Sequence, residues 1–146
     1  SARFTSPLGI AVDQSGNLYV ADYDNHTIRK IISTSSGWEV TTFAGKAGSP
    51  GYANGIGASA RFEHPWDITI DDNGNLFVVD NTPIVRKITP DGTVIPIIGT
   101  KAYSAYPIDG SGSEARFGGL FSIAIDKNGN LYVIDGHTIR KITFNN

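Results

Sequence analysis

Three pairs of oppositely charged residues stand at equivalent places along the chain and are its first candidates for a polar site. In each pair an Asp closes one apolar run and an Arg lies in the next run. The pairs are Asp22 with Arg29, Asp80 with Arg86, and Asp135 with Arg140. A carboxylate beside a guanidinium group can line a binding site, but a pair that recurs in every copy is better explained by a requirement of the scaffold. We therefore predict that these residues form a buried structural network.

Metal and nucleophile chemistry find little support in the sequence. Asp13, Asp71 and Asp126 each begin an Asp-x-x-Gly-Asn segment, which faintly resembles a calcium loop. The further carboxylates and the distal Glu of such a loop are missing, and an Asp followed by a Gly with positive φ is ordinary hairpin-turn chemistry. The chain has no Cys, and its three His residues show no zinc-binding spacing. We expect no metal, no cofactor and no catalytic residue within this chain.

The positions at which the copies differ are better candidates for a binding site, because the scaffold makes the same demands on each copy. At the start of the first apolar run, the copies read Ser6–Gly9, His64–Asp67 and Gly119–Ser122. Aromatic anchors beside a few polar groups are what a binding site requires. The predicted ligand-binding residues are His64, Trp66, Asp67 and Phe121, with Tyr103 and Tyr106 from a nearby loop. The alternative, which the sequence favours slightly, is that Trp66 and Phe121 fill gaps between copies.

One unit, written three times, must position all of these residues. The copies are residues 9–30, 67–87 and 122–141. Each contains an apolar run, a turn, a second run of β-branched and aromatic residues that ends in Asp, and a third run that carries Arg-Lys. A continuous apolar second run is typical of a strand that is covered on both faces. We predict an all-β chain in which each copy forms neighbouring antiparallel strands.

A fourth strand is expected in the first two copies only, at Glu39–Phe43 and Thr93–Ile98. Pro96 lies inside the second of these and cannot donate a ladder hydrogen bond, so we place the fourth strand at the outer edge of its sheet. Long Gly-rich segments, 45–60 and 99–115, then lead to the next copy. Loops of this length without regular structure are uncommon unless they serve a function.

These features together resemble a known repeat family. The runs PLGIAVD at 7–13, GNLYVAD at 16–22 and NHTIRK at 25–30, with a Gly-rich return that ends in Ala-Arg-Phe, are similar to NHL repeats of the bacterial type. The resemblance covers practically the whole chain at a period of about 55 to 58 residues. It implies one repeat region of a β-propeller with three blades, at about residues 1–45, 59–99 and 114–146, the third lacking its outer strand.

The resemblance also implies an assembly, because NHL propellers most often close with six blades. A stack of three blades leaves an apolar sheet face bare at each end. Two chains related by a twofold axis would complete a six-bladed ring, so we expect a homodimer. The absence of Met and a start in mid-repeat suggest a piece of a longer protein.

For function, the sequence favours a non-catalytic scaffold or binding module that presents a loop face to a protein, peptide, glycan-like or other small ligand. The alternative is an enzyme of the lyase or lactonase type with a metal in the channel, although the His residues do not reproduce the constellation of such lyases. A formal net charge of -2 argues against nucleic-acid binding. No apolar run approaches the roughly 20 residues of a membrane span. The lack of Cys does not settle the compartment, and an extracellular or periplasmic location is favoured.

Overall fold

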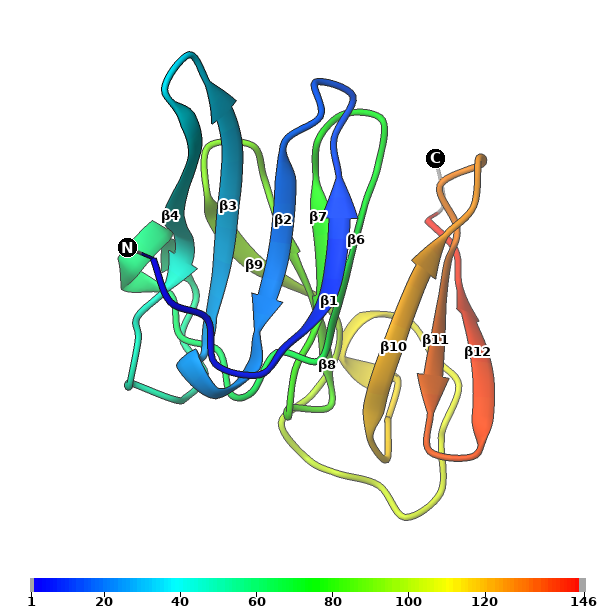
Figure 1. Cartoon of the computed structure of the whole chain (residues 1–146). Coiled ribbons are helices and arrows are strands. Elements are labelled where there is room, and N and C mark those ends of the chain that lie inside the picture. Colours follow the sequence, from blue (N-terminus) through cyan, green and yellow to red (C-terminus); the bar gives the residue numbers. More distant parts are fainter. Residues whose placement is uncertain (1, 145–146) are drawn as a thin grey trace.

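The computed structural model describes residues 2–144 and shows three antiparallel sheets side by side, which we call blades 1, 2 and 3 (Figure 1). Blade 1 has the strand order β1-β2-β3-β4, formed by Pro7–Val12, Leu18–Asp22, Thr27–Thr34 and Gly37–Gly45. Blade 2 has the order β5-β9-β8-β7-β6, formed by Gly55–Ile56, Thr93–Gly99, Ile84–Ile88, Leu76–Val79 and Asp67–Ile70. Blade 3 has the order β10-β11-β12, formed by Leu120–Ile125, Leu131–Asp135 and Thr138–Ile142. The expected all-β architecture is confirmed.

Three short 3-10 turns lie in the connections between strands: η1 at Tyr23–Asn25, η2 at Gly57–Ser59 and η3 at Gly112–Glu114. Within residues 2–144, no helix has the length and apolar character needed to cross a membrane. The inner strands β1, β6 and β10 are neighbours in space, since β6 contacts both of the others. The chain therefore runs from the inner to the outer strand of each blade and returns through a long loop to the next inner strand.

The hairpin turns that join the first two strands of each blade form as predicted. In blade 1, the Gly16 N–H donates to the Asp13 carbonyl at 3.0 Å, and Gly16 has a φ of 81°. Asp13 Oδ1 accepts the backbone N–H groups of Ser15 and Asn17, and the Asn17 amide donates to Asp13 Oδ2. The turns that begin at Asp71 and Asp126 repeat this pattern. Both carboxylate oxygens of each Asp are thus used within the turn itself.

Two hydrophobic cores lie between the blades. The core between blades 1 and 2 includes Ala21, Ile28, Phe62, Ile68 and Val78. The core between blades 2 and 3 is built from equivalent positions, among them Val79, Val85, Phe117, Ile123 and Val133. Each core joins the second and third strands of one blade to the strands and the Ala-Arg-Phe return of the next blade. A blade therefore shares one core with each neighbour.

Equivalent residues change from buried to exposed where a neighbouring blade is absent among the described residues. Ile28 and Val85 are 0 % exposed, whereas Ile139, at the same repeat position of blade 3, is 77 % exposed. On the other side of the stack, Ile10 of blade 1 is 58 % exposed, whereas its counterpart Ile68 is 3 % exposed. Each end of the stack therefore exposes apolar residues whose counterparts are buried in the cores between neighbouring blades.

One expectation about the strand order needs correction. The fourth strand of blade 2, β9, is not the outermost strand, because β5 from the preceding return pairs with it at Thr93 and Val94. Pro96 lies beyond these two residues, so its missing N–H removes no bond to β5. In blade 1, β4 is the edge strand as predicted, and within the described part of blade 3 no fourth strand is present.

The seam between the inner strands of blades 1 and 2 leaves no room for a side chain at Gly9. A Cβ there would lie 2.5 Å from Asp67 Oδ1, 2.6 Å from Asp67 Cα and 2.9 Å from the Ile68 nitrogen. We expect Gly9→Ala to lower the free energy of unfolding by about 1–3 kcal/mol, because it forces the two backbones apart. Gly119→Ala is the matched control, since its Cβ would make only ordinary contacts, at 3.5 Å from the Phe121 ring. Urea unfolding measures both, and equal stability of the two variants would contradict this close approach.

Candidate functional site

The repeated Asp and Arg residues fasten each return loop to its blade. Asp22, Asp80 and Asp135 are at most 1 % exposed. Each accepts a backbone N–H from the segment just before its own blade: Thr5 at 2.8 Å, Glu63 at 3.2 Å and Gly118 at 2.8 Å. The Arg partners lie 3.2 Å, 3.9 Å and 3.1 Å from these carboxylates. We call this arrangement the Asp–Arg clasp.

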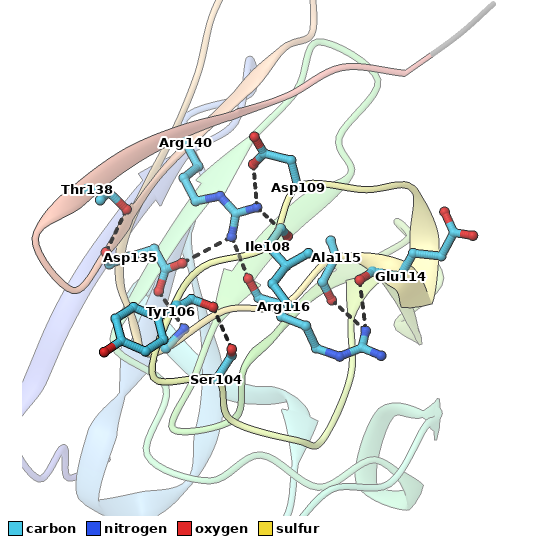
Figure 2. A network of polar contacts seen from close by, with 11 residues as sticks. Ser104, Tyr106, Ile108, Asp109, Glu114, Ala115, Arg116, Asp135, Thr138 and Arg140 are labelled. Carbon is cyan, nitrogen blue, oxygen red and sulfur yellow. Dashed lines mark hydrogen bonds and ion pairs between the residues drawn. The ribbon is translucent and has the colours of Figure 1, made fainter.

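The Arg of each clasp also explains the Ala-Arg-Phe ending of the returns. Arg86 lies with its guanidinium carbon 4.6 Å from the Phe62 ring centroid, and Arg140 lies 4.5 Å from that of Phe117. Figure 2 shows the blade 3 clasp, in which Arg140 donates to the Arg116 and Ile108 carbonyls as well as to Asp135. Both terminal nitrogens of Arg140 thus donate to carbonyl or carboxylate oxygens of the same chain, which leaves little of this group for a ligand.

Blade 2 holds the most deeply buried clasp. Both side chains of the Asp80–Arg86 pair are 0 % exposed. Burial raises the pKa of Asp80 to about 6, although bonds from Thr82 and the charge of Arg86 oppose that shift. Because the pair also supports the Glu63 backbone just before His64, it positions the start of the inner strand.

Aromatic and imidazole rings form a continuous row across the loop end of all three blades. The ring centroids are 4.3 Å apart for His26 and His64, 4.6 Å for His64 and Tyr23, 4.7 Å for Tyr23 and Trp66, and 5.6 Å for Trp66 and Phe121. We call these five residues the aromatic row. Tyr23 lies in η1 of blade 1, and His26 directly follows it. His64 and Trp66 lie just before β6 of blade 2, and Phe121 lies in β10 of blade 3. Separations of this size are those of favourable aromatic pairs.

A cavity of about 120 Å³ opens beside the row between blades 2 and 3. Its walls include Trp66, Phe121, Tyr103, Asn81 and Thr82. The Tyr103 hydroxyl donates to the Asn81 carbonyl, which holds this ring over the cavity. Phe121 is 47 % and Tyr103 58 % exposed, so aromatic surface remains available to a partner.

The structure does not bring all six candidate residues together. His64, Trp66, Phe121 and Tyr103 lie in the row or around the cavity. Asp67 instead faces the seam between the inner strands, where its Oδ2 accepts Ser122 Oγ at 2.7 Å and the Ile123 N–H at 3.0 Å. Tyr106 does not line the cavity and is 82 % exposed.

Tyr23, His26 and Asn81 belong to the site and were missed by sequence reasoning. Tyr23 and Asn81 occupy the same place, directly after the Asp that closes the second strand, where blade 3 has Gly136. The comparison of equivalent positions that identified Trp66 would have found them, had it been extended to this loop. Among residues 2–144, no three His, Asp or Glu side chains gather closely enough to hold a metal ion.

The two histidines of the row have an unusual backbone. His26 and His64 have φ values of 58° and 49°, and the His64 N–H donates to His26 Nδ1 at 3.1 Å. An accepting Nδ1 requires a neutral His26 ring with its proton on Nε2. Burial lowers the pKa of His26, and the charge of the neighbouring His64 lowers it further. The carboxylates of Asp24 and Glu63 oppose this shift. Protonation of His26 therefore opposes this contact between blades 1 and 2.

This geometry predicts a pH dependence of stability. Because the pKa of His26 in the folded protein lies below the usual 6.5, the contribution of His26 to the free energy of unfolding should fall as pH decreases through 6.5 toward the folded-state pKa. Asp80, whose pKa is raised, contributes a slope of opposite sign, so the effect of His26 is the difference between the slopes of the wild type and a His26 variant. His26→Asn should remove the His26 contribution, since Asn tolerates positive φ and keeps an acceptor without titrating. His137→Asn, an exposed residue at the same repeat position, is the control and should leave the slope unchanged. Urea unfolding as a function of pH checks this, and an unaltered slope in His26→Asn would refute it.

Comparisons with known proteins agree on the repeat. The NHL repeat family matches residues 4–31. An auxiliary nutrient binding protein from Bacteroides ovatus superposes with a TM-score of 0.81 at 25 % identity, over 92 % of this chain and 36 % of its own. A Bacteroides thetaiotaomicron protein of unknown function gives a TM-score of 0.81 at 28 % identity, over 97 % of this chain and 36 % of its own.

A curated relative also contains NHL repeats. NHL repeat-containing protein 2 of Bos taurus is 37 % identical over 86 residues, which are 56 % of this chain and 11 % of that protein. The chain thus spans about a third of these solved structures and about a tenth of this relative. The NHL family matches the first copy of the unit, and the later copies form blades of the same build. Residues 4–31 therefore match an NHL repeat, and the chain folds as three antiparallel blades that superpose on about a third of longer β-propeller chains.

Proposed function

We propose that this chain is a non-catalytic binding module, whose loop end presents the aromatic row and its cavity to a protein or peptide. The observation that carries the proposal is the cavity beside Trp66 and Phe121, which joins exposed aromatic surface to a small hollow. Partly exposed aromatic rings around a pocket are typical of the anchor points of protein interfaces.

The size of the cavity favours a side chain over a whole small molecule. At about 120 Å³ it is smaller than the roughly 300–1,000 Å³ of pockets that enclose small ligands. It suits one apolar side chain of a partner, packed against Trp66 and Phe121. The Asn81 side chain at its rim is exposed and can hydrogen-bond the partner's backbone.

The similarity to an auxiliary nutrient binding protein supports a binding role in general. Because this chain covers 36 % of that protein, the similarity does not carry over its ligand. A sugar ring can also stack on Trp66, so a glycan is the competing ligand class that the experiment has to separate.

We further propose that the exposed end faces are covered by further blades, in this chain by those of a second copy. The exposed residues of blade 3, Ile134 and Ile139, occupy positions that are buried against a following blade elsewhere in the stack. Ile10 and Val12 of blade 1 correspond to Ile68 and Ile70 of blade 2, which pack in the core against the preceding blade. Two copies could therefore bury both faces at two identical interfaces and close a ring of six blades.

Peptide binding is tested with a random dodecapeptide library displayed on phage, followed by calorimetry with selected peptides. We expect Trp66→Ala to weaken binding by about tenfold or more, as expected for an anchor residue. Trp38→Ala is the matched control, because Trp38 is 66 % exposed on β4 and lies outside the cavity. Circular dichroism should show both variants folded.

The proposal fails if no selected peptide loses affinity in Trp66→Ala. Selective binding to a glycan array that Trp66→Ala abolishes would reassign the site to sugars. Unfolding of Trp66→Ala would show that the ring acts as core; in that case Tyr103→Ala, which alters only an exposed wall of the cavity, decides the question.

Ring closure by a second copy is tested by light scattering. We expect twice the mass of one chain, because each end face otherwise exposes apolar surface. Ile139→Asp should yield monomers, since a charge is then placed in the interface. Ile56→Asp, a change at a residue that is 61 % exposed on β5 of the middle blade and therefore away from both end faces, should remain dimeric. A stable wild-type monomer would refute the dimer.

A further inference from the structure

The outer edge of β12 is unpaired within residues 2–144. In blades 1 and 2, the third strand pairs on its outer side with a fourth, β3 with β4 and β8 with β9. In blade 3, β12 pairs only with β11. An edge strand of this kind exposes a row of backbone donors and acceptors that can template another strand.

A groove runs along this edge. It consists of two adjoining hollows of about 550 and 410 Å³, which share Ile98, Gly110, Lys141 and Ile142 in their walls. One side of the groove is β12, and the other is β9 together with the return residues 107–112. The floor is apolar, with Ile98 and Phe117, whereas the rim carries Asp109 and Lys141.

Blade 2 shows what such a groove is shaped to hold. There, β9 lies between β8 and the two-residue strand β5, with Ile56 opposite Thr93 and Gly55 opposite Val94. The return residues Asn54–Ile56 of blade 2 correspond to Asp109–Ser111 of blade 3.

The return of blade 3 is already fixed in the corresponding place. Arg86 donates to Asn54 Oδ1 at 3.1 Å and to the Ala53 carbonyl. Arg140 likewise donates to Asp109 Oδ1 and to the Ile108 carbonyl, both at 2.8 Å (Figure 2). The two walls of the groove therefore correspond to the two neighbours of β9 in blade 2, and the groove takes the place of the strand between them.

We propose that this groove binds one extended polypeptide strand, antiparallel to β12, supplied by a partner polypeptide. The fourth strands of the other blades define its chemistry: β4 alternates apolar and polar residues over 38–41, β9 is largely apolar, and both end in Gly. Gly45 and Gly99 have φ values of 91° and 97°, and a Cβ would lie 2.7 Å from the His26 carbonyl oxygen or 2.3 Å from that of Pro83. The His137 carbonyl holds the equivalent position in blade 3, so the bound strand also needs Gly at its end.

This mode of binding draws its affinity from backbone hydrogen bonds and its selectivity from the groove. Apolar residues of the strand pack on Ile98 and Ile142, whereas Gly at its end permits the close approach to the loop. The site lies on the outer side of blade 3 and shares no residue with the aromatic row. It therefore stands independently of the peptide site proposed at the aromatic row, although Ile139 in its wall also belongs to the end face proposed to form the dimer.

The probe is a fluorescein-labelled peptide with the sequence of β4, GWEVTTFAG, added to the full 146-residue chain. We expect saturable binding by fluorescence anisotropy. Hydrogen exchange should slow at residues 138–142 and stay unchanged at β1 and β4, the edge strands of blade 1. Two control peptides should bind at least about tenfold more weakly: one with Gly45→Val, which clashes with the loop, and one with Thr41→Pro, which lacks a ladder donor. Thr41 is chosen because the next position, Thr42, corresponds to Pro96 of β9 and therefore tolerates Pro.

Three results would overturn the proposal. The first is no binding, or binding without slower exchange at residues 138–142. The second is equal binding of the Pro-containing peptide, which would show that strand pairing is not involved. The third is equal binding of the Gly45→Val peptide, which would show that the loop at His137 does not require Gly at the end of the strand.

Discussion

A single blade has two apolar faces, and each can be buried only against another sheet. This constraint governs the whole structure. The same repeat position is fully buried at Ile28 and Val85 and widely exposed at Ile139, although the residues are alike in type. Burial at this position is therefore decided by whether another blade follows. Stability in such an array is the sum of contributions from each blade and each seam, so what lies beyond blades 1 and 3 affects the stability of all three.

The Asp–Arg clasp fixes the position of the loops that carry the aromatic row. It holds the return loop against its own blade through buried carboxylates and a guanidinium group stacked on Phe. His64 and Trp66, which lie between the return and β6, are thereby held in a fixed position relative to η1 of the previous blade. Aromatic rings from different blades then meet with favourable separations. A rigid scaffold with variable residues at one end is a common way to build a binding face.

The repeat made most of the strands, the hairpin turns and the missing fourth strand of blade 3 predictable, because short-range patterns determine them. Contacts between blades were less accessible. The pairing of β5 with β9 involves two residues, too few to leave a periodic signal. The meeting of His26 with His64 depends on positive φ at two non-Gly residues, which sequence patterns rarely reveal. Asp67 was expected at the ligand site because it differs between copies, but it differs in order to bridge two inner strands.

That bridge has a consequence for how the array can evolve. Gly9, Asp67 and Ser122 hold the same place in the three blades, and Asp67 binds the hydroxyl and backbone offered by the Ser122 blade. If recombination placed two copies of blade 2 in succession, an Asp would face an Asp at their seam, and two carboxylates at such a distance repel each other. If it placed blade 2 before blade 1, the Asp would lose its hydroxyl partner. The blades have thus become specialised for their order, and a newly duplicated blade would have to diverge at this position before it could be retained.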